Sequence, residues 1–473
     1  MMHPLFAVKL YSTVIAFTVI LLHLSLIDYL DSAKASESVL DKVPNIFDSN
    51  QKVEVIFQKE IKRDGGGLSP VSSMTFLGAN DILLLNKNNG MVHRIVNGVL
   101  LKEPLLDVDV ANKRERGMLG IATTASSASN DDKDGVTKYV FLYYTESNKD
   151  GNDICPLAYY CEPGNDPLRN RLYRYELEDE KLVNPKLLFD LPATPGPTHN
   201  GGVIEIGPDN NVYVTIGDVH GHANNRSKTK AQNFQNGSDP DGRSGILRMT
   251  QNGEALEDDI LGNIYPLNFY YAYGIRNSFG IDFDPISGKL WDTENGPDYG
   301  DEINLVEPGF NSGWIELQGI WRPRFDEVKG GDFIAGDELL NPDKHELVDF
   351  DGKGKYSVPE FIWKEPVGAT AIKFLHSDKY GKEYKDDLFV GDVNNGYLYH
   401  FDLNKDRSGL VLKGRLQDKV ADTNTHDELN QIKFGEGFGG ITDIEVGPDG
   451  YLYILSYEKN TANIFKIISI NSK

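Results

Sequence analysis

The stretch that decides the fold is residues 198–218, THNGGVIEIGPDNNVYVTIGD. Its centre, Gly207–Asn210, reads GPDN, which is the residue chemistry of a tight reversal. The run that follows, Asn211–Asp218, is dominated by β-branched and aromatic residues, which favour a strand. The stretch therefore predicts strands around a tight turn, with His199 before them and Asp218 at their end.

Five further copies of this turn-and-strand pattern occur along the chain. They are Ile82–Asn86, Val140–Glu146, Lys289–Asn295, Asp387–Val393 and Tyr451–Tyr457. A unit of this size cannot bury a core alone, whereas six units stacked radially leave only short, protected edges. Beyond the N-terminal segment, no long run of residues has a sustained helical periodicity. We therefore predict an all-β protein, a six-bladed β-propeller.

Longer segments between the copies are irregular in sequence, and we expect them to be blade-top loops. They are Ser126–Gly135, Asn148–Asn170, His220–Gly245 and Gly319–Tyr356. The segment between Ser36 and Val71 is expected to enter the propeller and to close it by pairing with the last strand.

The charge of the chain limits its partners. The 473 residues carry a formal net charge of −23 and include 47 glycines, which supply abundant turns. A chain this acidic repels phosphate, so a nucleic-acid partner is not expected. The acidic balance suits a protein that binds divalent cations or works in cation-rich surroundings.

The N-terminal segment carries an export signal. Residues 5–30 form the one long apolar run, Lys9 precedes most of it, and Ala33-Lys34-Ala35 is a small-x-small cleavage pattern. We predict a signal peptide, residues 1–35, cut after Ala35, with residues 36–473 forming a single propeller domain outside the cytoplasm. The alternative is that residues 5–30 are retained as a membrane tether.

Two cysteines, Cys155 and Cys161, lie in one segment, CPLAYYC. An exported chain would oxidise them, so we predict a disulfide between them. The alternative is a pair of free thiols.

His199 and Asp218 form the first candidate catalytic pair. Both lie at the ends of the strands predicted around the GPDN turn. A carboxylate beside an imidazole fixes its tautomer and raises its basicity, as a general base requires. The alternative is a histidine that caps a turn, with an aspartate that binds backbone amides.

A second candidate site lies in the loops around residues 274–302. Arg276 and Asn277 follow Gly274, and a guanidinium in a central funnel would bind an anion or stabilise a developing oxyanion. The alternative is an arginine that ties two blades together. The run Asn295–Asp298, with Asp301-Glu302, offers the backbone carbonyls and carboxylates that Ca²⁺ prefers. The alternative is a solvated acidic turn.

The motifs of the chain come in the order of a known family. They are Gly117–Ala122 (GMLGIA), His199–Gly202 (HNGG), Gly207–Asp218 (GPDNNVYVTIGD), Gly245–Met249 (GILRM), Gly274–Asn277 (GIRN), Asn295–Pro297 (NGP), Asp301–Asn304 (DEIN), Asn311–Trp314 (NSGW) and Gly447–Tyr453 (GPDGYLY). On these motifs the chain resembles the soluble PQQ-dependent sugar (glucose/sorbosone, aldose) dehydrogenases over roughly residues 52–467. The fold of that family is the six-bladed propeller.

The resemblance implies roles for the candidate residues. His199 would take the proton from the anomeric hydroxyl of a sugar while hydride passes to PQQ, with Asp218 orienting the ring. Arg276 would lie by the reactive carbonyl of the quinone. The positions that correspond to the cofactor and metal sites are Arg276, Asn277, Asn295 and Asp301 for PQQ, and Gly296, Pro297 and Glu302 for Ca²⁺.

The chain departs from the family where cations bind the cofactor. The family holds the PQQ carboxylates with a lysine and two arginines, and the corresponding positions here are Asn394, Gly440 and Thr442. Losing three cations weakens the binding of a tricarboxylate. Lys373 and Lys364 are the candidates for replacing them from a neighbouring loop. A further departure is Ser312, where relatives with a second Ca²⁺ site place tyrosine.

The sequence thus favours an exported, Ca²⁺- and PQQ-dependent dehydrogenase of an aldose-type sugar, with an electron acceptor that it does not identify. Two alternatives stay open at this point. One is a propeller of the same descent that has lost PQQ and binds carbohydrate or protein. The other is a Ca²⁺-dependent hydrolase of the lactonase type, another chemistry found on six-bladed propellers.

Overall fold

The computed structural model describes residues 43–61, 68, 70–125, 138–147, 168–219, 228–326, 332–338, 347–422 and 426–470. Residues Pro44–Lys473 make up one compact unit. The predicted export segment, the insert Ser126–Gly135 and the cysteine pair Cys155 and Cys161 lie outside the described residues. Within the described ranges, no helix is both long and apolar enough to cross a membrane.

Among the described residues there are seven sheets, and six of them have four to six strands. The first holds β3 (Val71–Gly78), β4 (Asp81–Asn86), β5 (Met91–Val96), β6 (Val99–Leu100) and β7 (Leu106–Asp107), and the second β8 (Met118–Ala125), β9 (Lys138–Glu146), β10 (Arg169–Glu178) and β11 (Lys181–Pro192). The third holds β12 (Ile204–Ile206), β13 (Val212–Ile216), β14 (Gly245–Met249), β15 (Tyr270–Tyr273), β19 (Phe310–Asn311) and β22 (Lys355–Tyr356).

The fourth sheet holds β16 (Ser278–Phe283), β17 (Leu290–Glu294), β18 (Asp301–Val306), β23 (Phe361–Trp363) and β27 (Val420–Ala421). The fifth holds β24 (Ala369–Phe374), β25 (Leu388–Asp392), β26 (Tyr397–Phe401), β28 (Lys433–Glu436) and β1 (Asn45–Ile46), and the sixth β29 (Gly440–Val446), β30 (Leu452–Glu458), β31 (Thr461–Ser469) and β2 (Gln51–Glu60). The only α-helix of the described residues is α2 (His426–Leu429), and short 3₁₀ turns are η1 (Lys230–Gln232), η2 (Leu267–Phe269) and η4 (Gly414–Asp418).

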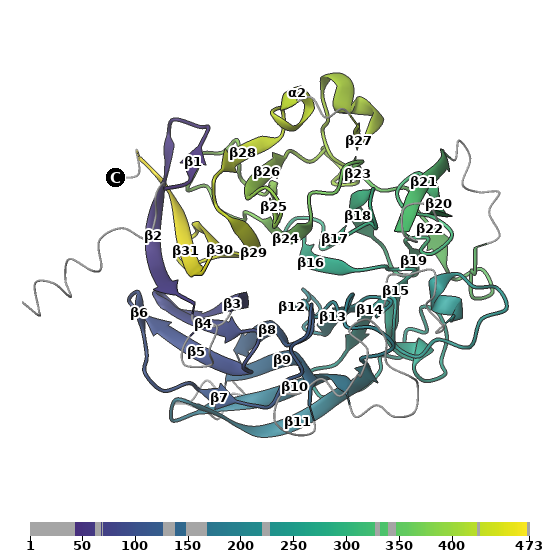
Figure 1. Cartoon of the computed structure of the whole chain (residues 1–473), viewed down its shortest axis with the longest axis horizontal. Coiled ribbons are helices and arrows are strands. Elements are labelled where there is room, and N and C mark those ends of the chain that lie inside the picture. The colour runs from purple at the N-terminus through teal and green to yellow at the C-terminus, as the bar shows by residue number, and fades with distance from the viewer. Residues whose placement is uncertain are drawn as a thin grey trace, which may run out of the picture. The chain divides into compact units, whose positions relative to one another are not determined.

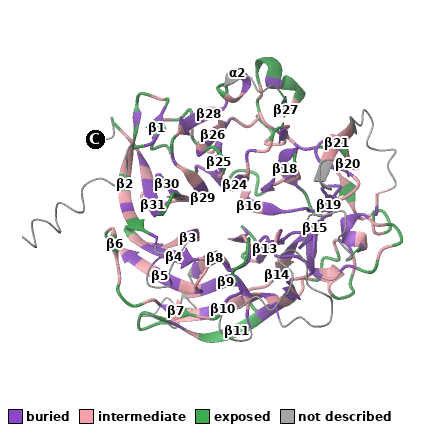
Figure 2. Cartoon of the chain, in the orientation of Figure 1, coloured by how far each residue is buried: buried purple, intermediate pink, exposed green. Residues whose placement is uncertain are grey.

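The first strand of each larger sheet lies at the centre of this unit (Figure 1). These strands touch one another in a closed circuit: β3 contacts β8, β8 contacts β12, β12 contacts β16, β16 contacts β24, β24 contacts β29, and β29 contacts β3. Buried residues gather on the strands, and exposed residues lie mainly on the outer turns (Figure 2). The prediction of an all-β propeller is confirmed.

The ends of the chain meet in one sheet. β2 pairs antiparallel with β31, from Gln51 opposite Ser469 to Glu60 opposite Thr461. The expectation that the segment after Ser36 closes the propeller against the last strand is confirmed. Such a closure joins both ends of the chain within one sheet, so the circle of sheets has no open seam there.

The stretch quoted first forms the hairpin of β12 and β13. The backbone N–H of Asn210 donates to the carbonyl of Gly207 at 2.8 Å, and the N–H of Gly207 donates to the carbonyl of Asn211 at 2.9 Å. The two strands are antiparallel. Because His199 precedes the first strand and Asp218 follows the second, the hairpin brings both residues to its open end.

One predicted loop is a hairpin instead. The insert Gly319–Tyr356 contains β20 (Trp321–Asp326) and β21 (Asp332–Glu338), which pair antiparallel, so this part of the insert is not irregular. The pairing satisfies backbone groups of the insert without help from the neighbouring sheets.

Apolar side chains fill the spaces between neighbouring sheets. One buried cluster joins the second and third sheets and includes Phe141, Leu172, Leu191, Val214, Leu247 and Tyr270. Packing of this kind fixes each sheet against the next, so the residues at the ends of the central strands are held on a rigid frame.

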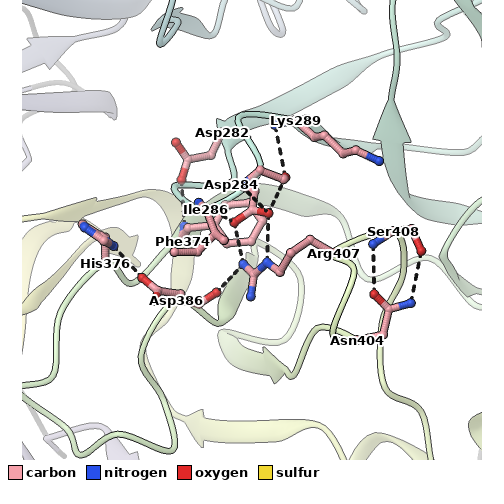
Figure 3. A network of polar contacts seen from close by, with 11 residues as sticks. Asp282, Asp284, Ile286, Lys289, Phe374, His376, Asp386, Asn404, Arg407 and Ser408 are labelled. Carbon is pink, nitrogen blue, oxygen red and sulfur yellow. Dashed lines mark hydrogen bonds and ion pairs between the residues drawn. The ribbon is translucent and has the colours of Figure 1, made fainter.

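Arg407 ties the fourth and fifth sheets together (Figure 3). Its guanidinium donates to both carboxylate oxygens of Asp284, at 2.9 and 2.6 Å, and to the carbonyl of Asp386 at 2.6 Å. Burial alone would raise the pKa of Asp284, but hydrogen bonds from Arg407 and Ser287 outweigh it and lower the pKa. This contribution to stability is therefore present above about pH 4 and is lost as the pH falls below it.

We expect Arg407→Ala to lower the free energy of unfolding by about 2 kcal/mol, because the buried carboxylate of Asp284 loses its two charged hydrogen bonds and keeps only the neutral donors of Ile286 and Ser287. Urea denaturation at pH 7 measures the change, with Arg415→Ala, at an exposed position of η4, as the matched control. Equal midpoints for the two variants would contradict the assignment of Arg407 as a tie between sheets.

Candidate active site

A cavity of about 740 Å³ is lined by residues at the inner ends of the sheets. Five of the predicted site residues lie on its wall, namely His199, Arg276, Asn277, Asn295 and Gly296. Asp218 stands directly behind His199, since their side chains are hydrogen-bonded. A cavity of this size is in the range of small-molecule sites.

The imidazole of His199 is paired with Asp218. Nδ1 of His199 lies 2.6 Å from Oδ1 of Asp218, and the two residues are 7% and 1% exposed. The other carboxylate oxygen of Asp218 accepts the indole N–H of Trp314 at 2.8 Å. The carboxylate favours the tautomer with its proton on Nδ1, which leaves Nε2 as the basic nitrogen. The arrangement is that of a general base held by a carboxylate.

Glu115 was not identified from the sequence, and it joins the two parts of the site. Its Oε2 accepts the backbone N–H of His199 at 2.6 Å and the side-chain amide of Asn277 at 3.2 Å. Glu115 also lines the cavity. Its place two residues before the motif that begins at Gly117 was the only signal in the sequence.

Arg276 and Asn277 present unused polar atoms beside the cavity. The guanidinium of Arg276 donates to the carbonyl of Asn295 at 2.7 Å and lies 5.3 Å from the ring of Trp314. Burial lowers the pKa of Arg276, against the opposing effect of nearby carboxylates, Asp218 first among them. Within the described residues, Nε of Arg276 and Oδ1 of Asn277 have no hydrogen-bond partner. Buried groups of this kind mark a place where a polar ligand can bind.

Asp301 shapes the loop of the predicted calcium site but does not line the cavity. One of its carboxylate oxygens accepts the N–H of Gly296 at 2.9 Å, and the other accepts those of Val367 and Gly368 at 2.9 and 2.7 Å. Burial raises the pKa of Asp301, and these backbone donors oppose the rise. The carboxylate thereby fixes Gly296, the loop residue that reaches the cavity. Pro297 is not among the lining residues.

Glu302 lies behind the cavity wall. Its carboxylate accepts the side-chain amide of Gln318 at 2.7 Å, and it faces Glu294 across the strand pair β17 and β18. The hydroxyl of Ser312 donates to Glu294 at 2.6 Å. Burial raises the pKa of Glu294 to about 7 and that of Glu302 well above its usual range. Asp301 and Glu302 are 1% and 0% exposed, so the alternative of a solvated acidic turn is wrong for these two residues, whereas Asp298 of the same loop is exposed.

Of the three positions where family cations are missing, one lies on the wall of the cavity. Thr442 lines it, and Oγ1 of Thr442 has no partner among the described residues. Asn394 is exposed, and neither it nor Gly440 is on the wall.

Lys373 lines the cavity but is surrounded by carboxylates. Its Nζ lies 2.7 Å from Glu205, 3.3 Å from Glu445 and 3.7 Å from Asp282. Burial would lower the pKa of Lys373, but these carboxylates raise it well above its usual value. Lys364, the other candidate, lies 6.0 Å from the ring of Trp321 and is not on the wall.

The contact between Trp314 and Asp218 yields a prediction on the rate of any reaction that uses His199 as a base. Trp314→Phe removes one hydrogen bond that holds the carboxylate, and we expect the turnover number to fall about tenfold. Steady-state kinetics of the reconstituted protein measures the change. Trp363→Phe is the matched control, because the buried indole N–H of Trp363 has no partner in the described part of the chain. An equal effect of both substitutions would contradict a role for Trp314 in holding Asp218.

Comparisons with known proteins point to one family. The family model described as glucose/sorbosone dehydrogenase matches residues 68–330. The chain is 25% identical over 401 residues to the aldose sugar dehydrogenase YliI of Escherichia coli K12, covering 82% of this chain and 87% of the relative. It is 30% identical over 255 residues to the quinoprotein glucose dehydrogenase B of Acinetobacter calcoaceticus, covering 52% of this chain and 48% of the relative.

Solved structures share the fold. The PQQ-bound aldose sugar dehydrogenase of Streptomyces coelicolor superposes with a TM-score of 0.56 at 20% identity, covering 90% of this chain and 99% of that chain. The soluble aldose sugar dehydrogenase of Escherichia coli superposes with a TM-score of 0.61 at 21% identity, covering 89% of this chain and 99% of that chain.

Proposed function

Because this chain belongs to the glucose/sorbosone dehydrogenase family, we propose that it oxidises a hydroxyl of an aldose-type sugar, with PQQ as the hydride acceptor and His199 as the general base. The observation that carries the proposal is the buried His199–Asp218 pair on the wall of the same cavity as Arg276 and Asn277. Oxidation of an alcohol needs a base for the proton and an acceptor for the hydride. His199 would be the base, and Arg276 would stabilise the charge that develops on the acceptor.

The residues of the cavity fit PQQ. Arg276 and Asn277 line the wall, and Nε of Arg276 and Oδ1 of Asn277 are buried with no partner among the described residues. The cavity volume of about 740 Å³ is in the range of small-ligand sites. Arg276, Asn277 and Asn295 would hold the cofactor, which supplies the hydride-accepting carbonyl when bound. A relative with the same fold is named as PQQ-bound, which supports this choice.

In the proposed mechanism, Nε2 of His199 takes the proton of the sugar hydroxyl. Asp218 holds the ring with its proton on Nδ1 and stabilises the imidazolium that forms. Trp314 fixes Asp218 through its indole N–H. Arg276, anchored on the carbonyl of Asn295, stabilises the negative charge that develops opposite the base.

We propose that Ca²⁺ binds at the carbonyls of Gly296 and Pro297. Asp301 supports this loop by accepting the N–H of Gly296. The carboxylate of Glu302 lies behind the wall, so a calcium ion in the cavity would be held without it. Carbonyl oxygens are ordinary ligands of this cation.

Three further features belong to the proposal. We propose that each of the six larger sheets is one blade, so that the fold is a six-bladed propeller. Residues 1–35 are taken as an export signal, or residues 5–30 as a tether, with the domain spanning 36–473 outside the cytoplasm. Cys155 and Cys161 are taken as a disulfide.

Reconstitution tests the proposal. Residues 36–473, purified with Ca²⁺, are titrated with PQQ, and dye reduction is then followed with a panel of aldoses. We expect stoichiometric uptake and sugar-dependent dye reduction, both lost when chelator is present during the titration. A folded protein that takes up no PQQ at micromolar concentration would contradict the proposal and leave a binding module in its place.

A further inference from the structure

We propose that Lys87 and Arg114 bind the carboxylates of the cofactor and take the place of the cations missing at Asn394, Gly440 and Thr442. This inference rests on the proposed function. Both side chains line the cavity that His199 and Arg276 line. They come from the first sheet and its connection to the second, far in sequence from the positions where the family carries its cations.

The ammonium group of Lys87 is held in place by its surroundings. Its Nζ donates to the carbonyls of Arg114 and Arg116 at 2.8 and 2.7 Å, and to Oδ1 of Asn88 at 3.2 Å. The side-chain amide of Asn112 donates to the carbonyl of Asn88 at 2.8 Å, which ties the two loops together. A carboxylate can take the place of the Asn88 contact, the longest of the three, and the charge is already positioned for it.

The loop that carries Arg114 adjoins the catalytic pair. The next residue, Glu115, accepts hydrogen bonds from the backbone of His199 and from the side chain of Asn277. A ligand that touches Asn277 and Arg276 is therefore within the part of the cavity that this loop borders. The guanidinium of Arg114 has a planar fork of donors that matches a carboxylate.

The other lining lysine is in a different part of the cavity. Asp282, one of the partners of Lys373, lies five residues along the chain from Asn277, a span of about 16 Å in a strand. Glu205 and Glu445 also pair with Lys373, so its charge is compensated inside the protein. Lys87 and Arg114 lie on the wall in the loops beside the catalytic pair and offer two cations to the carboxylates of the ligand, while Arg276 serves its reactive carbonyl.

Equilibrium binding tests the inference without turnover. The full mature chain in Ca²⁺ is titrated with PQQ by isothermal calorimetry, and Arg114→Gln, Lys87→Gln and the double variant are compared with wild type. We expect each single substitution to raise Kd about tenfold and the double to raise it further. Lys113→Gln is the matched control, since Lys113 belongs to the same loop and does not line the cavity.

A second ligand separates charge recognition from damage to the loop. The trimethyl ester of PQQ lacks the three negative charges, so we expect wild type and variants to bind it with equal, weaker affinity. The exposed position of Arg114 makes that variant safe for folding, which thermal melting verifies. If folded Arg114→Gln and the double variant both bound PQQ with the wild-type Kd, this inference would be overturned and the proposed function would stand. Absence of PQQ binding by wild type would overturn the proposed function as well.

Discussion

His199→Ala is expected to lower the rate of sugar-dependent reduction of bound PQQ by about 10²- to 10⁴-fold, the usual contribution of a general base. The reason is local. Nε2 of His199 is the basic nitrogen left after Nδ1 bonds to Asp218 at 2.6 Å, and His199 lines the cavity with Arg276. Stopped-flow absorbance of the quinone after mixing with a sugar measures the rate, and the PQQ content of each variant is determined beforehand.

The chain contains a matched control for this substitution. His376 is also paired with an aspartate, Asp386, at 2.5 Å (Figure 3). Its side chain is 61% exposed, however, and His376 is not among the residues that line the cavity. We expect His376→Ala to reduce quinone at the wild-type rate. Asp218→Asn should give an intermediate loss, because the ring keeps a partner but loses the charge that stabilises the imidazolium. A His199→Ala variant as fast as His376→Ala would rule out His199 as the base.

Lys373→Met is expected to lower the free energy of unfolding by about 3–5 kcal/mol at pH 8, the cost of breaking a buried ion pair from one side. Lys373 is 8% exposed and stands among Glu205, Asp282 and Glu445, which lie on the central strands of three other sheets. Without the ammonium group these carboxylates face one another with no compensating charge. Urea denaturation measures the loss, with Lys382→Met at an exposed position as control.

The pH dependence of this loss has a defined sign. Burial raises the pKa of Asp282 to about 7, although Lys373 opposes the rise. A carboxyl whose pKa is higher in the folded state favours folding at low pH, and this contribution is lost as the pH rises through 7. The Lys373→Met defect should therefore be smaller at pH 5 than at pH 8, and Glu445→Gln should restore part of the stability. A defect independent of pH, with no rescue by Glu445→Gln, would contradict the electrostatic account.

The sequence predicted those parts of the site that are local in the chain. The GPDN turn predicted a hairpin, and a hairpin brings His199 and Asp218 to one end whatever surrounds it. The closing strand was also predicted from the sequence, although the same segment contributes β1 to the fifth sheet as well. These inferences needed only strand alternation and turn chemistry.

The contacts made across the propeller could not be predicted in the same way. Glu115 reaches His199 from 84 residues away, and nothing in its own neighbourhood indicates that contact. Lys373 was a candidate for binding the cofactor, but its carboxylate partners are on strands of other blades. Asp301 looked like part of a metal loop, and its bonds to Val367 and Gly368 depend on how the fourth and fifth sheets pack.

The measurement that tests the central claim most directly is a single-turnover experiment with residues 36–473 loaded with PQQ. The quinone absorbance is followed after mixing with an aldose, either unlabelled or deuterated at the anomeric carbon, in the absence of any dye. The account predicts that the sugar bleaches one quinone per chain and that deuterium slows the bleaching, because hydride leaves that carbon. A stoichiometrically loaded, folded protein that no aldose in the panel bleaches would contradict it.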